Sequence, residues 1–319
     1  MERILITGGA GFIGSNMADA FLEKGYDVSI LDNFSTGNSK NIQHIKSKIE
    51  MHKGDVCDDK LLKKALKNCD YVFHLAALRS VPKSFNNPEE YERVNVIGTI
   101  KLLQLSVENK IKKFVFASSS SVYGDSAKLP LEEEMPCSPI SPYAISKFNA
   151  ELYCKLFYNN YKLQTVSLRY FNVFGPRQSL ENKYAVVIPK FIQSLYNNES
   201  PPIYGDGHQT RDFTFVENVI AAHEAVLKSN KTHGKSYNVA CGERHSVLNV
   251  AKDLNKLMKK DIKPQFLQAR PGDVLHTQAS IDHLQKDANY VPPVSFQKGL
   301  EKTVSWFFKN TDYLVATKD

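Results

Sequence analysis

A glycine-rich turn near the N-terminus places the strongest constraint on the fold of this 319-residue chain. Four glycines between positions 8 and 14 follow the apolar run Arg3–Thr7 and open an amphipathic segment at Ile13–Lys24. A strand that turns this tightly into a helix needs residues without a Cβ, and it presents backbone amides and a positive dipole end to an anion such as pyrophosphate. The pattern predicts a dinucleotide-binding turn whose contacts come from Gly8, Gly11, Phe12, Ile13 and Gly14.

A carboxylate stands at the end of the second apolar run, Asp27–Leu31. Asp32 lies 18 residues after Gly14. At this spacing it can accept hydrogen bonds from the ribose hydroxyls of an adenosine, and it repels a 2′-phosphate. No Arg follows immediately in Asp32-Asn33-Phe34. The sequence therefore favours NAD over NADP as cofactor, with Asp32 and Asn33 beside the adenosine.

A second acidic residue follows the third apolar run, in Gly54-Asp55-Val56. Asp55 and Val56 are expected beside the adenine ring. An exposed Asp55 that caps the following helix agrees with the sequence nearly as well.

Apolar runs and helix-length amphipathic segments alternate through the first half of the chain, which is the pattern of a parallel sheet covered on both faces. Strands are expected at Arg3–Thr7, Asp27–Leu31, Glu50–Lys53, Tyr71–His74, Lys113–Ser118 and Gln164–Arg169. Helices are expected near Ile13–Lys24, Asp59–Lys67, Tyr91–Asn109 and Pro142–Tyr161. The order predicts an α/β fold with a doubly wound parallel sheet.

The regular alternation ends after Arg169, where Pro and Gly become frequent. A smaller, mixed α/β C-terminal domain that binds the substrate is expected there. Tyr237–Ala240 reads as a strand that returns to the first sheet. The expected domains are therefore discontinuous: residues 1–171 with about 205–243 form the first, and residues 172–204 with 244–319 form the second.

Composition excludes several other classes of protein. Lys and Arg outnumber Asp and Glu by 41 to 34, but no basic run is longer than a pair such as Lys112-Lys113. Nucleic acid is therefore not an expected partner, whereas a small anionic substrate fits. No apolar stretch approaches the ~20 residues of a membrane helix, and the N-terminus lacks a signal-peptide pattern, so no membrane contact and a cytoplasmic location are expected. The five cysteines lack ligand spacing, and no metal site is expected.

Two side chains with complementary proton chemistry lie one helical turn apart. In Ser141–Lys147, Ser141 suits a helix N-cap and Pro142 the first turn. Tyr143 and Lys147 then share one face of the helix. A neighbouring ammonium group and a nicotinamide cation can lower the pKa of a phenol from ~10 toward the range of a general base. The pair predicts a catalytic Tyr; the alternative is a Tyr and a Lys that merely share a face.

A run of hydroxyl side chains, Ser118–Ser121, leaves the carboxyl end of the fifth expected strand. Ligands of doubly wound sheets bind at this edge. Four hydroxyls are costly in a core and useful as partners of a polar substrate. The run is expected to contact substrate, and a polar serine-rich turn is the alternative.

Several motifs in one order resemble the extended short-chain dehydrogenase/reductase family. They are Thr7–Gly14, His74–Ala77, the serine run, Tyr143-x-x-x-Lys147 and Arg169–Pro176. Within that family the chain is similar to the UDP-hexose 4-epimerases, from its start to about Lys309. The resemblance implies a Rossmann domain, bound NAD and a UDP-sugar substrate.

The resemblance also implies a homodimer, in which helices equivalent to Tyr91–Asn109 and Pro142–Tyr161 form a four-helix bundle. The second of these helices carries an apolar stripe. Burial against the helix's own sheet explains the stripe just as simply. The stripe consists of Ile145, Phe148, Leu152 and Leu156.

The family motifs assign a role to each matching residue. Tyr143 matches the catalytic base, Lys147 the lysine that binds the cofactor ribose and lowers the pKa of the base, and Ser119 the hydroxyl that bonds the C4 oxygen of the sugar. Further cofactor contacts are implied for Leu75, Ala76, Ala77, Asn95 and Tyr170. Further substrate contacts are implied for Arg79, Ser80, Ser120, Ser121, Asn172, Val187, Phe191, Arg211, Arg270, Asp273 and Thr277.

Four of these residues match the part of the family's site that holds the nucleotide. Asn172, Arg211 and Arg270 match residues that contact the diphosphate, and paired guanidinium groups suit that anion. From the sequence alone, each Arg would more often be a surface charge. Asp273 matches the residue on the uridine ribose.

The serine run separates the reactions of the family. Members that eliminate water carry an Asp-Glu pair at the positions of Ser120 and Ser121, because elimination needs an acid and a base. Members that decarboxylate a 4-keto uronic acid carry Glu at the position of Ser121. Serine at both positions favours redox chemistry at C4 without elimination, which is 4-epimerisation.

The choice of sugar depends on fewer residues. Thr277 matches a position where epimerases restricted to glucose and galactose carry Tyr, so its small side chain favours UDP-GlcNAc and UDP-GalNAc, with UDP-Glc and UDP-Gal as further substrates. The chain looks most like bacterial UDP-N-acetylglucosamine 4-epimerases of polysaccharide and O-antigen synthesis. Arg79 departs from that subgroup, where Gly is expected, and its cation could favour UDP-glucuronate. Val187 and Phe191 resemble the uracil wall, although an apolar face of a strand or helix is equally plausible.

A protein of a different class, a catalytically inactive NAD-binding sensor, would keep the glycines and Asp32. It would lose the catalytic trio. Because Ser119, Tyr143 and Lys147 are all present, the enzyme is favoured.

Overall fold

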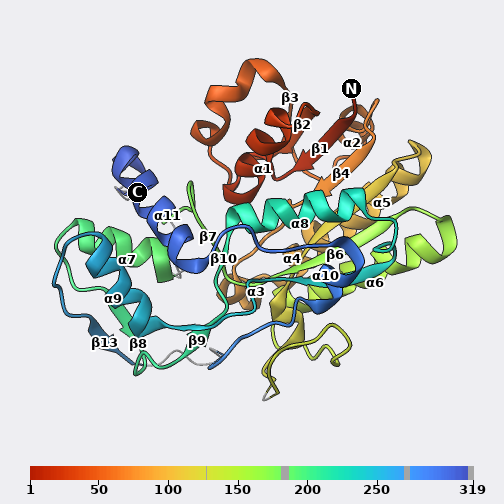
Figure 1. Ribbon diagram of the computed structural model, residues 1–319. Helices are drawn as coiled ribbons and strands as arrows, with labels where there is room; N and C mark the ends of the chain where they lie inside the picture. Colours follow the sequence, from red (N-terminus) through yellow and green to blue (C-terminus); the bar gives the residue numbers. More distant parts are fainter. Residues whose placement is uncertain (127, 181–186, 269–273, 315–319) are drawn as a thin grey trace.

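A seven-stranded parallel sheet forms the centre of the molecule (Figure 1). The computed structural model describes residues 1–126, 128–180, 187–268 and 274–314. The strand order is β11-β6-β5-β4-β1-β2-β3. Successive strands are added on one side of β1 as far as β3 and, from β4 on, on its other side, as in doubly wound folds. The strands are β1 Arg3–Thr7, β2 Asp27–Asp32, β3 Ile49–Lys53, β4 Tyr71–His74, β5 Lys113–Ser119, β6 Thr165–Tyr170 and β11 Lys235–Val239.

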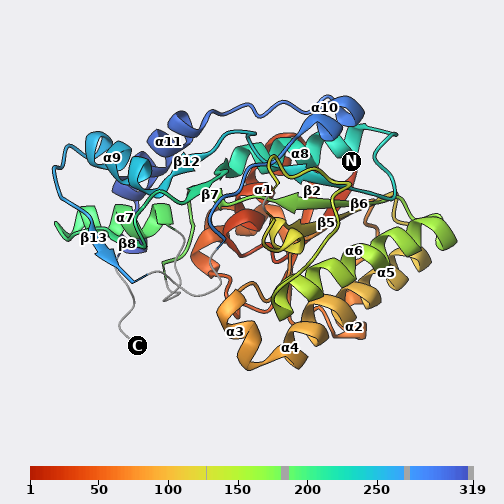
Figure 2. The ribbon, with the colours of Figure 1, turned by 90° about the horizontal axis from the view of Figure 1, so that it is seen from below.

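Helices cover both faces of this sheet (Figure 2). On one face, α1 (Phe12–Glu23) and α8 (Val216–Lys228) bury apolar side chains such as Phe21 and Val219. The opposite face is covered by three helices, which bury residues such as Leu102 and Phe157. They are α2 (Asp59–Ala65), α5 (Gly98–Glu108) and α6 (Pro142–Tyr161). Because both faces are buried, the innermost strands are rich in apolar residues, as in Ile4–Ile6 of β1 and Phe114–Ala117 of β5.

The six strands expected in the first half are all present, each within one residue of its expected bounds. The strand expected at Tyr237–Ala240 returns to this sheet as β11 and pairs in parallel with β6. The doubly wound fold class is therefore confirmed.

The helix expected at Tyr91–Asn109 is not a single α-helix. It consists of α4 (Pro88–Glu92), a π-helical turn at Arg93–Ile97, and α5. The sequence also did not predict the 3₁₀ segment Ser39–Lys48 or the short helix α3 (Val81–Asn86). Both lie in the connections that follow β2 and β4, and their apolar residues are too few to give a helical period that distinguishes them from loops.

A second cluster of buried residues lies in the C-terminal part, where Phe174, Phe215, Leu254, Leu300 and Phe307 pack together. The small sheets there are both parallel and antiparallel, as the prediction of a mixed fold requires.

The remaining elements are a 3₁₀ turn at Ser120–Tyr123, β7 Val173–Phe174, α7 Val187–Tyr196, β8 Pro202–Tyr204, β9 Thr210–Arg211, β10 Thr214–Phe215, β12 His245–Ser246, α9 Val247–Leu257, β13 Gln265–Leu267, α10 Asp282–Ala288, α11 Phe296–Lys309 and a 3₁₀ turn at Thr311–Tyr313. The exact domain boundaries stay a prediction.

None of the helices within the described ranges is both long enough and apolar enough to span a membrane.

Candidate active site

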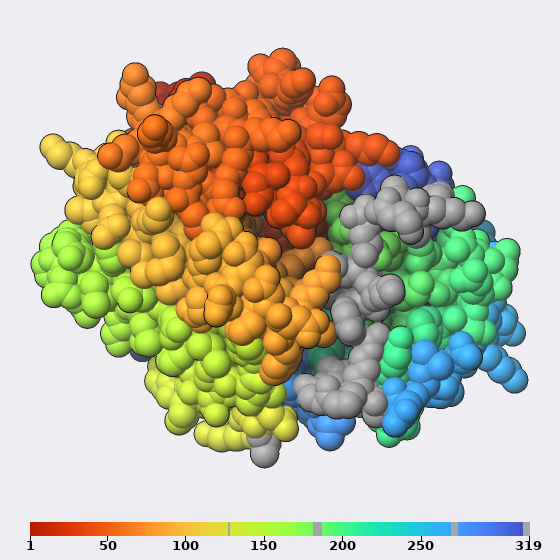
Figure 3. All heavy atoms as spheres, turned by 180° about the vertical axis from the view of Figure 1, so that it is seen from behind, coloured from red at the N-terminus to blue at the C-terminus, as the bar shows by residue number. Residues whose placement is uncertain are grey.

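A cavity of about 980 Å³ opens at the carboxyl ends of the central strands. Figure 3 shows one face of the molecule, with the N-terminal half in red to yellow and the C-terminal part in green to blue. The cavity wall joins the glycine turn, the end of β2, the segment after β4 and the first turns of α6. Of the predicted residues it contains Gly8, Gly11, Phe12, Ile13, Gly14, Asp32, Asn33, Asp55, Val56, Leu75, Ala76, Ala77, Arg79, Tyr143, Lys147 and Tyr170.

The glycine turn packs too closely for larger residues. Gly8 has a φ of +71°, and a Cβ there would lie 2.8 Å from the backbone nitrogen of Ala76. A Cβ on Gly14 would collide with the carbonyl oxygen of Gly8. Helix α1 begins after Gly11 without a side-chain cap. Its first amide groups are therefore available to an anion in the cavity.

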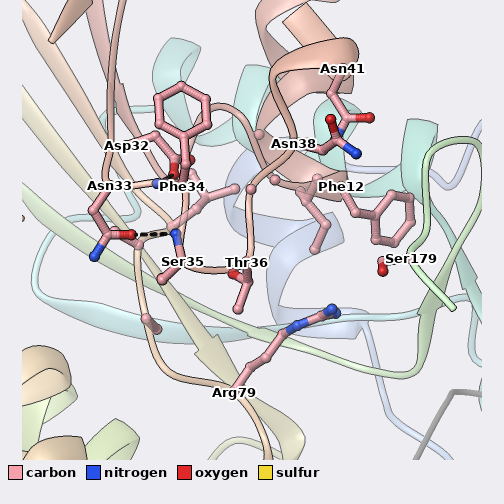
Figure 4. Close-up of a pocket in the computed structure, with 18 of the residues that line it drawn as sticks. Phe12, Asp32, Asn33, Phe34, Ser35, Thr36, Asn38, Asn41, Arg79 and Ser179 are labelled. Carbon is pink, nitrogen blue, oxygen red and sulfur yellow. Dashed lines mark hydrogen bonds between the residues drawn. The ribbon is translucent and has the colours of Figure 1, made fainter. Parts of the chain in front are cut away.

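Asp32 ends β2 with a nearly buried carboxylate. Its two oxygens accept hydrogen bonds from the backbone nitrogens of Ala10 (2.9 Å) and Phe34 (2.8 Å). Burial raises the pKa of Asp32, and these two hydrogen bonds lower it. The backbone thus holds the carboxylate at the cavity wall (Figure 4). There its remaining lone pairs can accept hydrogen bonds from the hydroxyl groups of a ligand.

Asp55 lies on the same wall but does not cap the next helix. Helix α2 is capped by Asp58, whose side chain accepts from two backbone amides. Asp55 accepts instead from the backbone nitrogen of Cys57 at 2.8 Å and from Arg93 at 3.3 Å. The capping alternative for Asp55 is therefore wrong.

Helix α6 begins where the sequence predicted. Ser141 is its N-cap and accepts from the backbone nitrogen of Ala144, and Pro142 occupies the first turn. Tyr143 and Lys147 both line the cavity. The predicted pair is thus brought to the same wall as the glycine turn.

Lys147 is held in a buried position. Its Nζ donates to the carbonyl oxygen of Ala117 at 2.7 Å and lies 4.9 Å from the ring centre of Phe116. Burial lowers the pKa of Lys147 to about 7. A proton on this side chain is therefore easily exchanged near neutral pH.

Two polar neighbours act on Tyr143. Burial raises the pKa of its phenol, whereas a hydrogen bond with Ser119 and the positive charge of Arg79 lower it. Ser119 also accepts a 2.9 Å hydrogen bond from the hydroxyl of Ser121. Ser119 thus lies near the phenol of Tyr143, although Ser118 and not Ser119 is among the residues that line the cavity.

Ser118, the first residue of the serine run, faces away from this contact. Its hydroxyl donates to the buried carboxylate of Glu151 on α6. The run therefore divides: Ser118 ties the strand to the helix, whereas Ser119 meets the phenol of Tyr143.

Arg79 follows β4 and extends into the cavity between Thr36 and Ser179 (Figure 4). Arg79 is exposed to solvent within the open cavity. Among the residues that the structure describes, Arg79 has neither a hydrogen-bond nor an ion-pair partner. It is a free cation beside the candidate base.

Ser80 and Asn95 support the cavity wall from behind. Ser80 is the N-cap of α3, where its side chain accepts from the backbone nitrogen of Lys83. Asn95, in the π-helical turn, bonds both backbone groups of Leu78 and the hydroxyl of Ser146. Both side chains are thus engaged by the protein itself, and neither belongs to the cavity lining.

Three predicted substrate residues meet in the C-terminal part. The hydroxyl of Thr277 lies 3.5 Å from Oδ1 of Asn172, and its backbone nitrogen donates to Thr210 beside Arg211. The guanidinium group of Arg211 donates to the carbonyl oxygen of Leu275. Two other predicted residues, Arg270 and Asp273, lie outside the described residues.

The predicted uracil wall lies in a hydrophobic core. Phe191 is buried, and Val187 packs partly buried against the same cluster, which includes Phe174. Neither lines the cavity as the described residues define it.

Comparison with known proteins agrees with this geometry. Residues 4–240 match the model of the NAD dependent epimerase/dehydratase family. The chain belongs to this family. A UDP-N-acetylglucosamine 4-epimerase from Methanobrevibacter ruminantium, solved in complex with UDP-N-acetylmuramic acid, is 41% identical over 97% of this chain and 99% of its own, with a TM-score of 0.93.

Two further relatives show the range of reactions in the epimerase/dehydratase family. A UDP-glucose 4-epimerase from Thermotoga maritima, solved with UDP-glucose, is 33% identical over 97% of this chain and 99% of its own, with a TM-score of 0.92. The dTDP-D-glucose 4,6-dehydratase from Homo sapiens is 33% identical over 97% of this chain and 91% of its own.

The cavity fits the NAD of the epimerase/dehydratase family. The uncapped start of α1 suits the pyrophosphate, and Asp32 suits the ribose of the adenosine. Tyr143 and Lys147 lie at the end of β5, whereas Asp32 lies at the end of β2. The strands β4 and β1 separate the two, so the cavity between them has space for an extended dinucleotide.

Sequence reasoning missed two buried residues of the site. Glu151 accepts hydrogen bonds from Ser118 and Arg169 directly behind Lys147. Glu151 stands four residues after Lys147, so its helical spacing could have revealed it. Arg169 lies in a strand that is buried along its whole length, where an Arg is rare unless it is paired.

Proposed function

We propose that this epimerase/dehydratase is an NAD-dependent 4-epimerase of UDP-sugars that interconverts UDP-GlcNAc and UDP-GalNAc, and also accepts UDP-Glc and UDP-Gal. The observation that carries the reaction type is the pair Ser120 and Ser121 beside the contact of Tyr143 with Ser119. An elimination needs an acid and a base at the far end of the sugar, and serine hydroxyls serve poorly as either near neutral pH.

Proton transfer at C4 falls to Tyr143. Its phenolate takes the proton of the C4 hydroxyl and becomes the phenol, which returns the proton after the sugar has turned over. Lys147, whose pKa burial lowers to about 7, supplies an adjustable positive charge on the same helix face. Ser119 orients the C4 oxygen toward Tyr143, with which it shares a hydrogen bond.

The chain's own residues hold the cofactor in place. When bound, NAD supplies the acceptor for the C4 hydride and the hydride that returns to the opposite face. The start of α1 holds the pyrophosphate, Asp32 the adenosine ribose, and Lys147 the ribose of the nicotinamide. Because the hydride returns to the same sugar, no net NADH is formed.

The UDP part of the substrate anchors the sugar during this rotation. We assign the diphosphate to Asn172, Arg211 and Arg270, and the uridine ribose to Asp273. Support comes from the contact between Asn172 and Thr277 beside the strand of Arg211.

The choice of an N-acetylated sugar depends on Thr277. A small side chain at this position leaves space for a 2-acetamido group. The 41% identity to a UDP-N-acetylglucosamine 4-epimerase supports the same choice.

UDP-glucuronate is a second candidate substrate, and Arg79 is the observation that favours it. A guanidinium group without a protein partner in the described part of the cavity suits a C6 carboxylate.

We further propose that the enzyme is a homodimer. Ile145, Leu152 and Leu156 of α6 are 42%, 51% and 43% exposed, although the same helix buries Ala150 and Phe157 on its sheet. Burial on the helix's own sheet therefore does not account for these three side chains. A second copy of this helix pair would cover them.

The reaction is tested by incubating the purified protein separately with UDP-GlcNAc, UDP-Glc and UDP-glucuronate and resolving the C4 epimers by NMR. Conversion of UDP-GlcNAc to UDP-GalNAc without accumulation of NADH supports the proposal. A 4-keto-6-deoxy product would instead assign the chain to the dehydratases.

A further inference from the structure

One face of helix α6 carries three residues that together form the junction with the sheet. Tyr143, Lys147 and Glu151 are spaced by four residues, so they lie on the same side of the helix. Lys147 bonds the carbonyl oxygen of Ala117 at the end of β5. Glu151 bonds Ser118, the next residue of that strand.

The third contact continues this series. Tyr143 lies close enough to Ser119, the last residue of β5, for the Ser119 hydroxyl to lower the pKa of its phenol. Three consecutive residues at the end of β5 thus lie against one face of α6: Ser119 near Tyr143, Ala117 at Lys147 and Ser118 at Glu151. A shift of the helix along the strand would separate the candidate base from Ser119.

The Glu151 carboxylate is the member of this series that also reaches other strands. It accepts from Arg169 of β6 at 2.8 and 3.0 Å and from the hydroxyl of Ser236 of β11 at 3.1 Å. Ser118 and Arg169 are neighbours across the β5–β6 ladder. One side chain therefore receives hydrogen bonds from three adjacent strands.

The ion pair of Glu151 and Arg169 is deeply buried, with side-chain exposures of 3% and 5%. Arg169 is satisfied on its other side by the hydroxyl of Tyr123 at 2.9 Å and by the carbonyl oxygen of Glu133. Any displacement of Glu151 would leave charges unpaired in the interior, which is costly. The helix therefore has one favourable position on the sheet.

We infer that Glu151 is a positioning residue, which sets the position of α6 on the sheet and thereby holds Tyr143 and Lys147 at the end of β5. The inference rests on the proposed function, in which these two side chains manage the C4 proton. Glu151 itself lies behind the cavity and does not line it.

Two variants test this role, with kinetics measured on the NAD-loaded enzyme and cofactor affinities on the protein freed of NAD. Glu151→Asp keeps the charge but shortens the side chain. Glu151→Met combined with Arg169→Met removes both charges, which avoids an unpaired buried ion and keeps the protein foldable. Glu133→Gln is the matched control, because the Glu133 side chain accepts from the backbone of Asn238 in the same network and, among the described residues, has no hydrogen bond to α6.

We expect kcat of both variants to fall about 10- to 100-fold while KM for the UDP-sugar stays within about 3-fold, because misplacement of reacting groups acts on the chemical step. NAD affinity should fall while ADP affinity is unchanged, since ADP contacts only the glycine turn and the Asp32 end. The control should retain wild-type values.

A folded double variant with wild-type kcat and an unchanged ratio of NAD to ADP affinity would overturn the inference. So would a loss carried by KM alone, or an equal loss of NAD and ADP affinity. If the wild type epimerises no UDP-sugar, the proposed function fails, and the ratio of the two affinities still decides the role of Glu151.

Discussion

Lys147 donates a 2.7 Å hydrogen bond to the carbonyl oxygen of Ala117, and this contact holds a cationic side chain inside the protein. The side chain is 4% exposed, and burial lowers its pKa from 10.5 to about 7. The stability of the protein should therefore depend on pH through this one residue.

Below pH 7 both the folded and the unfolded chain carry the Lys147 charge, and the folded chain bears the full cost of burying it. Between pH 7 and 10.5 Lys147 is protonated in the unfolded chain but largely neutral in the folded chain. The free energy of unfolding therefore rises with pH in this range. Relative to Lys147→Met, the cofactor-free wild type should gain about 2–3 kcal/mol between pH 6.5 and 9, measured by urea unfolding. Parallel curves for the two proteins would show that Lys147 keeps its charge in the fold.

Removal of the Tyr143 hydroxyl tests the base. Tyr143→Phe should lower kcat by roughly 10²–10⁴-fold and leave NAD content and folding intact, because only proton transfer is lost. Tyr153→Phe is the control, since Tyr153 lies on the exposed side of the same helix. Wild-type turnover in Tyr143→Phe would remove Tyr143 from the mechanism.

The Asp32 carboxylate is expected to select NAD over NADP. Asp32→Ala should weaken NAD binding and relax the rejection of NADP, because the negative charge at the ribose is lost. Isothermal titration with both cofactors measures the two effects. The interpretation of Asp32 is wrong if the wild type already binds NADP as tightly as NAD.

Thr277 is expected to bound the space beside the C2 substituent of the sugar. In Thr277→Tyr the ring should fill that space at a cost of ~1–3 kcal/mol, so kcat/KM should fall for UDP-GlcNAc and stay within a few fold for UDP-Glc. Thr277→Val keeps the shape but removes the hydroxyl that contacts Asn172, and it should retain both activities. Equal losses on both sugars in Thr277→Tyr would indicate general support of the pocket.

The exposed stripe on α6 is expected to form the dimer contact. Leu152→Lys should convert a dimer into a monomer in light scattering at micromolar concentration, because a charge would be buried between two helices. Val291→Lys, at another exposed apolar residue, is the control. A wild type that is monomeric under these conditions would refute the homodimer.

Features that depend on neighbours in the chain were readable from the sequence. The glycine turn requires residues without a Cβ wherever it is placed, and Asp32 follows its strand at a spacing set by one βα unit. The pairing of Tyr143 with Lys147 follows from helical periodicity alone. These local rules predicted the parallel sheet and the cofactor contacts of the glycine turn and Asp32, whereas those of Leu75, Ala76, Ala77 and Tyr170 came from the resemblance to the family.

Contacts between distant segments were decided only by the tertiary structure. Thr277 contacts Asn172, which lies 105 residues away in the sequence. Glu151 of helix α6 pairs with Arg169 of strand β6. Periodicity marks an apolar face on α6 but does not state what covers it: the sheet covers Ala150, whereas Leu152 stays exposed. The physical reason is that local spacing specifies on which face of its own helix or strand a side chain lies. Its burial and its charge partners depend on which other element packs against that face.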